Sequence, residues 1–244
     1  MTIDELVNYI ATTPHNQNKK ILEQQILALE KDGDNDNVEN DDSFKAVIER
    51  TATEITLPSD LTKIGYYAFY GWDKLTSMSI PGGVTSIDRR AFSGCTNLAL
   101  TSLPDELTSI GAYAFENCTN LALTSLPDGI TSIGNYAFTG CSNLALTSLP
   151  NGISKLESSA FQSCKKLALR SLPSSLSYIG SYAFIACSNL STITFNGKPA
   201  TIFNNVFSSC TNLTTINVPW AEGEVSGAPW GATNATINYN HTGG

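Results

Sequence analysis

PDELTSIGAYAFENCTNLALTSL (residues 104–126) decides the fold, because this stretch recurs along the chain at a constant interval of 23 residues. Cysteines, phenylalanines and prolines all keep this interval. They are Cys95, Cys118, Cys141, Cys164, Cys187 and Cys210; Phe69, Phe92, Phe115, Phe138, Phe161, Phe184 and Phe207; and Pro58, Pro81, Pro104, Pro127, Pro150 and Pro173. A fixed period of roughly 20 to 50 residues is typical of a solenoid, in which each unit buries its apolar face against its neighbours. Such a fold favours an extended binding surface over a single enzymatic pocket.

Apolar residues occupy constant positions when each unit is numbered from its proline as position 1. In the unit quoted above, they are Leu107, Ile110, Ala114–Phe115, Leu121 and Leu126, at positions 4, 7, 11–12, 18 and 23. Positions 18–23 predict a strand that ends at the next proline. Positions 8–13 predict a short helical turn, into which a glycine at position 8 would ease the backbone. The sequence therefore predicts an α/β solenoid of about eight coils, a right-handed superhelix with a parallel sheet on its concave side.

The chain divides into three predicted regions. Residues 1–31 predict a helical hairpin, because Thr2 and Glu5 fit a capping box and apolar residues follow at helical spacing. Residues 32–42 are an acidic linker; a calcium loop is the alternative, but Asn37 stands where such a loop needs glycine. The solenoid occupies residues 43–244, with an N-terminal cap at 43–57, seven units over 58–218 and a C-terminal cap at 219–244. The hairpin is too short to form its own core, so we expect it to dock on the solenoid, to join copies into a homo-oligomer, or to insert into a partner.

The repeated pattern LxxLxLPxxLxxIxxxAFxxCxxL resembles the bacterial surface-antigen (BspA-like) class of leucine-rich repeats over about residues 51–218. This resemblance implies a leucine-rich repeat superhelix, a surface or secreted protein, and adhesion or host-protein binding. The segment NVPWAEGEVSGAPWGATNATINY (217–239) resembles an ending shared by repeat proteins of gut bacteria and their prophages.

The net charge of −8 is concentrated at the N-terminus, where residues 1–42 carry −7. The solenoid is nearly neutral and has no cluster of lysine and arginine, which makes nucleic acid an improbable partner. No stretch of about 18 apolar residues predicts a membrane span, and no secretory leader is visible. The localisation is left open, with the cell surface, the extracellular space and a virion as the candidates.

The cysteines predict buried free thiols, because each occupies the same position of successive units and Trp72 replaces it in the first unit. A position that accepts an indole is an apolar packing position, and no CxxC pair offers a zinc framework. His15 and His241 both lie outside the repeats, and no carboxylate pair breaks the repeat pattern. We therefore expect no catalytic residue, no metal site and no cofactor.

The run at positions 18–23 decides what the concave face presents. Met78 places an apolar residue at position 21, whereas the middle units place leucines at position 20: Leu100, Leu123, Leu146 and Leu169. In a uniform register these leucines form an exposed stripe and Arg170 is buried. In the favoured alternative, a one-residue bulge turns the leucines inward while the ladder stays paired. The concave face is then a hydroxyl-rich strip of Thr101, Ser102, Thr124, Ser125, Thr147, Ser148, Arg170 and Ser171.

Tyrosines recur at position 10 as Tyr67, Tyr113, Tyr136 and Tyr182. Ring packing between coils is the favoured interpretation, and binding through Tyr113 and Tyr136 is the alternative. The function predicted overall is non-enzymatic binding of a protein or glycan surface by an adhesion-type module of a host-associated bacterium. The alternative is a structural or receptor-binding component of a phage or prophage particle, with residues 1–31 as its attachment segment.

Overall fold

The computed structural model describes residues 53–57 and 59–242. The predicted helical hairpin (1–31), the linker (32–42) and most of the N-terminal cap lie outside these residues. The C-terminal cap lies within them, apart from its last two residues.

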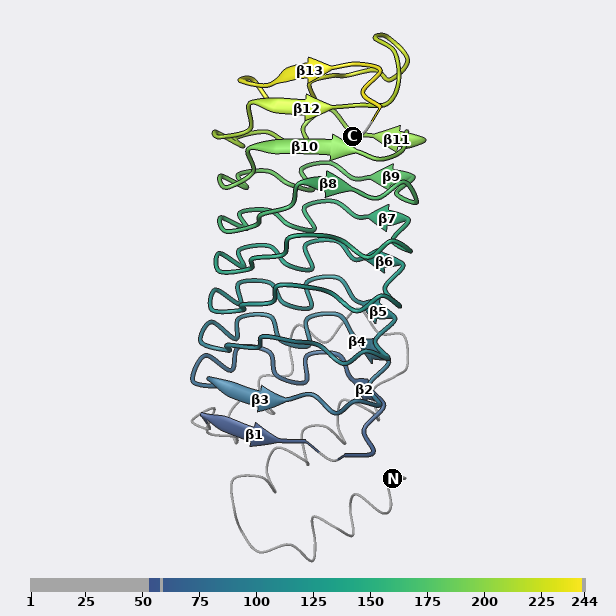
Figure 1. The fold of residues 1–244 in the computed structure, drawn as a ribbon. Helices are drawn as coiled ribbons and strands as arrows, with labels where there is room; N and C mark the ends of the chain where they lie inside the picture. Colours follow the sequence, from purple (N-terminus) through teal and green to yellow (C-terminus); the bar gives the residue numbers. More distant parts are fainter. Residues whose placement is uncertain (1–52, 58, 243–244) are drawn as a thin grey trace, which may run out of the picture.

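The described chain winds into a column of stacked coils, about one coil for each 23-residue unit (Figure 1). Thirteen short strands run across the coils. They are β1 (Glu54–Thr56), β2 (Lys63–Ile64), β3 (Ser77–Ser79), β4 (Ser86–Ile87), β5 (Ser109–Ile110), β6 (Ser132–Ile133), β7 (Lys155–Leu156), β8 (Ser171–Leu172), β9 (Tyr178–Ile179), β10 (Thr192–Phe195), β11 (Thr201–Ile202), β12 (Thr215–Asn217) and β13 (Thr236–Asn238). All the strand pairs are parallel, as expected when each strand pairs with its equivalent in the next coil.

One sheet runs through all seven units without interruption, in the order β11-β9-β7-β6-β5-β4-β2. Its strands occupy positions 6 and 7, and equivalent residues pair across coils, such as Ile87 with Ile110. Position 7 points into the core and position 6 points outward, which gives the alternation that a half-buried strand requires. This side of the coil repeats with little variation from unit to unit.

The predicted helical turn at positions 8–13 is wrong, since the described part of the chain contains turns and strands but no helix. The third unit shows why. The N–H groups of Tyr113, Phe115 and Asn117 each donate to a carbonyl of the next coil, at 2.7–2.8 Å. The N–H groups between them donate within the turn, to the residue three positions earlier. An α-helix would direct every N–H back along its own axis. The α/β label is therefore also wrong for the described residues, which form a parallel β-solenoid.

Left-handed backbone produces this alternation. Position 10 has a positive φ of 56–60° in six units, and position 14 has one in all seven, mostly without glycine. The glycines at position 8 serve a different purpose from the one predicted. A Cβ on Gly134 would lie 2.7 Å from the backbone nitrogen of Ala112 in the preceding coil. Glycine here permits close approach of two backbones.

The core is a set of columns that run the length of the solenoid. Seven phenylalanine rings at position 12, from Phe69 to Phe207, stack with centroids 5.1–5.6 Å apart. Each aromatic pair adds about 0.5–1.5 kcal/mol beyond the area it buries. At the C-terminal end, Phe195, Trp220 and Trp230 pack together and close the last coil. Bulky, irregular residues are expected where a solenoid must cover its final apolar face.

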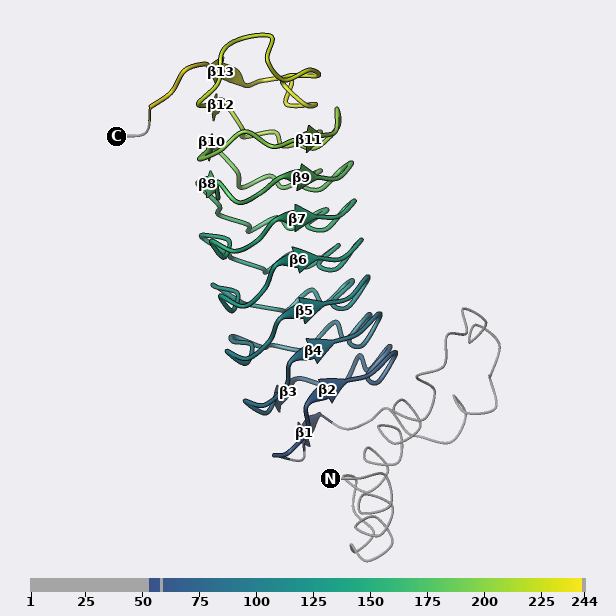
Figure 2. The same ribbon diagram turned by 90° about the vertical axis from the view of Figure 1, so that its right-hand side faces the viewer.

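The second side of the coil, at positions 18–23, is interrupted. β1 and β3 form one small sheet, and β8, β10, β12 and β13 form another. Between them, residues 98–103, 121–126 and 144–149 contain no strand. Figure 2 shows the two small sheets and the continuous sheet on different sides of the column. The predicted parallel pairing on this side is confirmed for β1, β3, β8, β10, β12 and β13. The sheet does not continue through the second to fourth units, where the predicted strand is absent.

The predicted burial at positions 20 and 21 is confirmed. Leu100, Leu123, Leu146 and Leu169 are 0–6% exposed, whereas Thr124, Thr147 and Arg170 are exposed. The expectation that the ladder stays paired through a bulge is wrong. Two consecutive residues, at positions 21 and 22, face solvent in the middle units, and this breaks the alternation that a paired strand needs.

Candidate functional site

The hydroxyl strip, defined as the eight residues Thr101, Ser102, Thr124, Ser125, Thr147, Ser148, Arg170 and Ser171, lies on the interrupted side of the solenoid. Its first seven residues are exposed and Ser171 is half-buried. The inward leucines at position 20 fix the outward direction of positions 21 and 22 in each coil. The structure therefore brings all eight onto one side. The six from Thr101 to Ser148 lie in the coils between β3 and β8, Arg170 directly precedes β8, and Ser171 is its first residue.

Backbone groups of the strip, like its side chains, are free to form hydrogen bonds with a ligand. In the paired region toward the C-terminus, β10 and β12 align residue by residue. In the second to fourth units, Thr147 N–H to Thr124 C=O, at 3.4 Å, is the one backbone hydrogen bond within the described residues that involves positions 21–23. The other N–H and C=O groups of Thr101 to Leu103 and of Thr124 to Leu126 have no protein partner there. Unpaired main-chain groups beside exposed hydroxyls are ready to bond a ligand, as they do on an exposed sheet edge.

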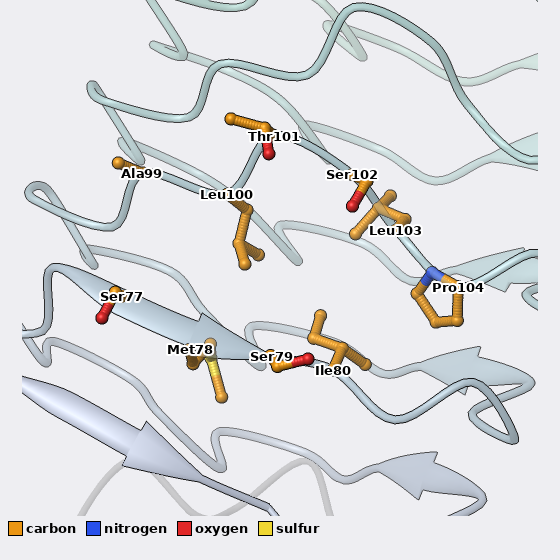
Figure 3. A pocket seen from close by; sticks show the side chains of 10 residues that line it. All are labelled: Ser77, Met78, Ser79, Ile80, Ala99, Leu100, Thr101, Ser102, Leu103 and Pro104. Atoms are coloured by element: carbon orange, nitrogen blue, oxygen red, sulfur yellow. The ribbon is translucent and has the colours of Figure 1, made fainter.

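A cavity of about 210 Å³ opens at the N-terminal end of the strip, beside Thr101 and Ser102 (Figure 3). Its lining is uncharged and consists of Ser77, Met78, Ser79, Ile80, Ala99, Leu100, Thr101, Ser102, Leu103 and Pro104. The apolar residue that faces inward is Met78 at position 21 in the first unit, but Leu100 at position 20 in the second. The two runs diverge where this change occurs, and Figure 3 shows Leu100 pointing toward β3. This cavity was not predicted from the sequence, although the change from Ser-Met-Ser in the first unit to Ala-Leu-Thr in the second was its signal.

Arg170 supplies the one charged side chain of the strip. Its side chain is exposed and its C=O accepts a hydrogen bond from Thr194 N–H at 2.9 Å, just before β8 begins. The guanidinium therefore lies at the end of the strip where strand pairing resumes. A guanidinium at this place can pair with a carboxylate of a bound partner in a bidentate geometry.

Tyr113 and Tyr136 lie apart from the strip. They follow the continuous sheet, at position 10, and their rings stack with centroids 4.8 Å apart and planes 5° apart. The favoured prediction of ring packing between coils is confirmed for this pair. The ten residues singled out from the sequence thus form two separate groups on different sides of the coil.

The six thiols of the cysteine column have low chemical reactivity. All six thiols are free and buried, as predicted. Each Sγ–H donates to the phenylalanine carbonyl of the preceding coil at 2.9–3.1 Å. Burial raises the pKa of Cys118, Cys141, Cys164 and Cys187 well above that of a free thiol, and raises that of Cys210 to about 11. A thiol that stays protonated is a poor nucleophile and a poor metal ligand. The described residues contain no cluster of metal-binding side chains.

Comparison with known families gives the assignment. The model for the BspA-type leucine-rich repeat region, of six copies, matches residues 40–167 and 110–225. The chain belongs to this family. No curated protein matched the sequence. Within the part of the chain that the structure covers, no helix is long and apolar enough to cross a membrane.

Solved structures of bacterial leucine-rich repeat proteins are similar to this chain. A leucine-rich cell surface protein from Faecalibacterium prausnitzii shares 26% identity, with a TM-score of 0.54 over 68% of this chain and 54% of that one. A leucine-rich repeat protein from Bacteroides ovatus shares 26% identity, with a TM-score of 0.47 over 78% of this chain and 61% of that one. A leucine-rich repeat protein from T. pallidum shares 27% identity, with a TM-score of 0.45 over 70% and 73%. The chain thus spans a little over half the length of the first two.

Proposed function

We propose that this BspA-type protein is a non-enzymatic adhesion module that binds a protein or glycan surface through the hydroxyl strip. Proteins of the leucine-rich repeat family generally mediate protein interactions, and the similar F. prausnitzii protein is a cell surface protein. The observation that carries the proposal is the combination, on one side, of outward hydroxyls and unpaired backbone groups across the second to fourth units.

The strip suits polar partners for a physical reason. Serine and threonine hydroxyls both donate and accept, and their short side chains lose little conformational freedom when they bind. Main-chain groups add donors and acceptors at fixed places between them. The uncharged cavity next to Thr101 and Ser102 would receive a single neutral group of the ligand, since its volume of about 210 Å³ is below the roughly 300 Å³ at which pockets for drug-sized ligands begin.

A paired substitution tests the proposal. Thr124→Lys with Thr147→Lys places two long cations in the strip, and Ser109→Lys with Thr131→Lys places two at exposed positions on the continuous-sheet side. The full chain would be screened on a glycan array and on immobilised mucin glycoproteins. The strip variant should lose at least about tenfold in affinity for the ligands that the full chain binds, which corresponds to about 1.4 kcal/mol. Equal binding by both variants would contradict the proposal.

Residues 1–31 carry the second hypothesis, a component of a phage or prophage particle. If they form the hairpin predicted from the sequence, their apolar residues, including Leu22, Ile26 and Leu29, exceed what that hairpin alone could bury. If this segment assembles copies, light scattering should give an oligomer for the full chain and a monomer for residues 43–244. Monomers in both cases would contradict self-assembly and leave the adhesion proposal intact.

A further inference from the structure

A second group of side chains, on a different side from the strip, forms a continuous stack along four coils. Position 10 holds Tyr67, Arg90, Tyr113 and Tyr136 in succession, and these four residues are named the tyrosine–arginine stack. The Arg90 guanidinium lies 5.8 Å from the ring centroid of Tyr67 and 4.9 Å from that of Tyr113. Aromatic rings in the coils on either side therefore hold one guanidinium in the row, through cation–π contacts.

Within residues 53–57 and 59–242, Arg90 has no anionic partner. Among the described residues, none accepts a hydrogen bond from its guanidinium, and its buried Nε has no acceptor. Two neighbouring carboxylates are engaged elsewhere: Asp88 pairs with Lys63 at 2.9 Å, and Glu116 accepts a hydrogen bond from the Ser93 hydroxyl at 3.0 Å. Nε is the one nitrogen of this guanidinium that is both buried and unpartnered, so the two terminal Nη atoms are left to meet solvent or a ligand.

The neighbouring phenol groups extend this donor array. Among the described tyrosines, only Tyr182 has a hydroxyl that bonds a protein group, the side-chain amide of Asn205 at 3.3 Å. The hydroxyls of Tyr67, Tyr113 and Tyr136 are thus free to donate. Because the Tyr113 and Tyr136 centroids are 4.8 Å apart, these donors recur at the spacing of the coils.

We propose that the tyrosine–arginine stack binds an oxyanion, a sulfate or carboxylate, on an acidic polysaccharide. Both Nη atoms of Arg90 donate to the oxyanion, and the hydroxyls of Tyr67 and Tyr113 donate beside them. Charge-assisted, bidentate hydrogen bonds to a guanidinium are among the stronger polar contacts. A side chain already held between two rings loses less entropy on binding than a mobile one.

The stack favours a polysaccharide over other polyanions. Two guanidiniums lie among its three neutral hydroxyls, that of Arg90 and that of Arg89, which is 5.8 Å from the Tyr113 ring centroid. This matches a linear polymer with many hydroxyls and sparse charges. A nucleic acid carries a charge on every residue and needs several cations for tight binding. The proposal goes beyond the adhesion function assigned to the hydroxyl strip, because it uses a different side of the solenoid and a different ligand chemistry.

The test uses the full chain and immobilised dextran sulfate, with alginate as the carboxylate polymer and unmodified dextran as the neutral one. We expect binding to at least one acidic polymer and none to dextran. Arg90→Gln should weaken that binding at least about tenfold, in the range of a lost charged hydrogen bond. Lys165→Gln makes the same charge change at an exposed position outside both the strip and the stack, and should stay within about twofold of the unsubstituted chain.

Two further variants keep the result interpretable if Arg90→Gln alters folding. Tyr113→Phe retains the ring and removes one donor, so it should weaken binding by about two- to tenfold with an unchanged thermal unfolding curve. Arg90→Lys should fall between the unsubstituted chain and Arg90→Gln. The proposal is overturned if neither acidic polymer binds, if Arg90→Gln and Lys165→Gln weaken binding equally, or if single-stranded DNA binds as tightly as dextran sulfate. The strip variant with two lysines reports separately on the adhesion proposal.

Discussion

The two sides of each coil obey the same 23-residue period, yet only one of them forms a continuous sheet. At positions 6 and 7, one outward and one inward residue recur in every unit, and seven strands pair without a gap. At positions 18–23, the inward residue changes from position 21 in the first unit to position 20 in the second, and the second to fourth units contain no strand there. Periodicity therefore positions the core, whereas the in–out alternation within a run decides whether neighbouring backbones can pair.

The largest effect should come from raising the pH, which acts on the regular columns. Burial raises the pKa of Cys118, Cys141, Cys164, Cys187 and Cys210. The unfolded chain then loses these protons at lower pH than the folded chain does. The stability contribution is complete below the unfolded-state pKa near 9 and falls as pH rises above it, by up to about 1.4 kcal/mol per thiol and pH unit.

Urea unfolding at pH 7, 8, 9 and 10 measures this loss. The midpoint should be nearly constant up to pH 8 and should drop steeply above pH 9. The double variant Cys118→Ala with Cys141→Ala is the control and should show a shallower drop, because two of the thiols are gone. Identical pH slopes for the two proteins would show that the thiol column does not govern alkaline stability.

A matched pair of aspartates should sharpen the contrast between inward and outward residues in one middle run. Leu123 is 0% exposed, so Leu123→Asp buries a carboxylate among apolar groups and should cost about 4 kcal/mol or more. Thr124 is exposed, so Thr124→Asp should change the free energy of unfolding by less than about 0.5 kcal/mol. Thermal unfolding followed by circular dichroism measures both. Similar losses in the two variants would mean that the run does not hold the described orientation.

A pair of glycine substitutions should give the smallest difference. On the turn side, a Cβ on Gly134 meets the backbone of the preceding coil at 2.7 Å, so Gly134→Ala should cost about 1–3 kcal/mol. Gly152 is exposed and its nearest neighbour would be the Asp128 carbonyl oxygen at 3.7 Å. Gly152→Ala should be neutral or stabilise by up to about 1 kcal/mol. Chemical denaturation compares them, and a harmless Gly134→Ala would show that the coils are free to separate there.

Much of the fold followed from residue type and spacing. The apolar positions 7, 12 and 18, the buried thiols and the inward leucines at position 20 were all predicted, because burial of a repeated side chain depends on its place in the unit. The short helical turn predicted at positions 8–13 is absent from the described residues. The sequence Gly-x-Tyr-Ala-Phe fits a helical turn, and nothing in it reveals that alternate N–H groups donate to the next coil.

The candidate site was only half predictable. The hydroxyl strip followed from the burial argument, since Arg170 could not be placed in the core without a partner. The cavity beside Met78 and Leu100 did not follow, because it depends on how far two neighbouring runs diverge. The placement of Arg90 could not be predicted either. The sequence shows an arginine among tyrosines at position 10, but it does not show that the guanidinium lies between the rings of Tyr67 and Tyr113.

The sequence by itself determined the repeat, the solenoid, the residues of the core and the side chains that face outward. These depend on the periodicity of side-chain polarity, which is written along the chain. Only the tertiary structure decided which backbones pair, where the strip lies open, and which charged group stands between two rings. These features depend on distances between coils. When the inward-facing residue moves by one position along the unit, backbone groups of neighbouring coils no longer align, and hydrogen bonds that the same amino-acid composition could form are lost.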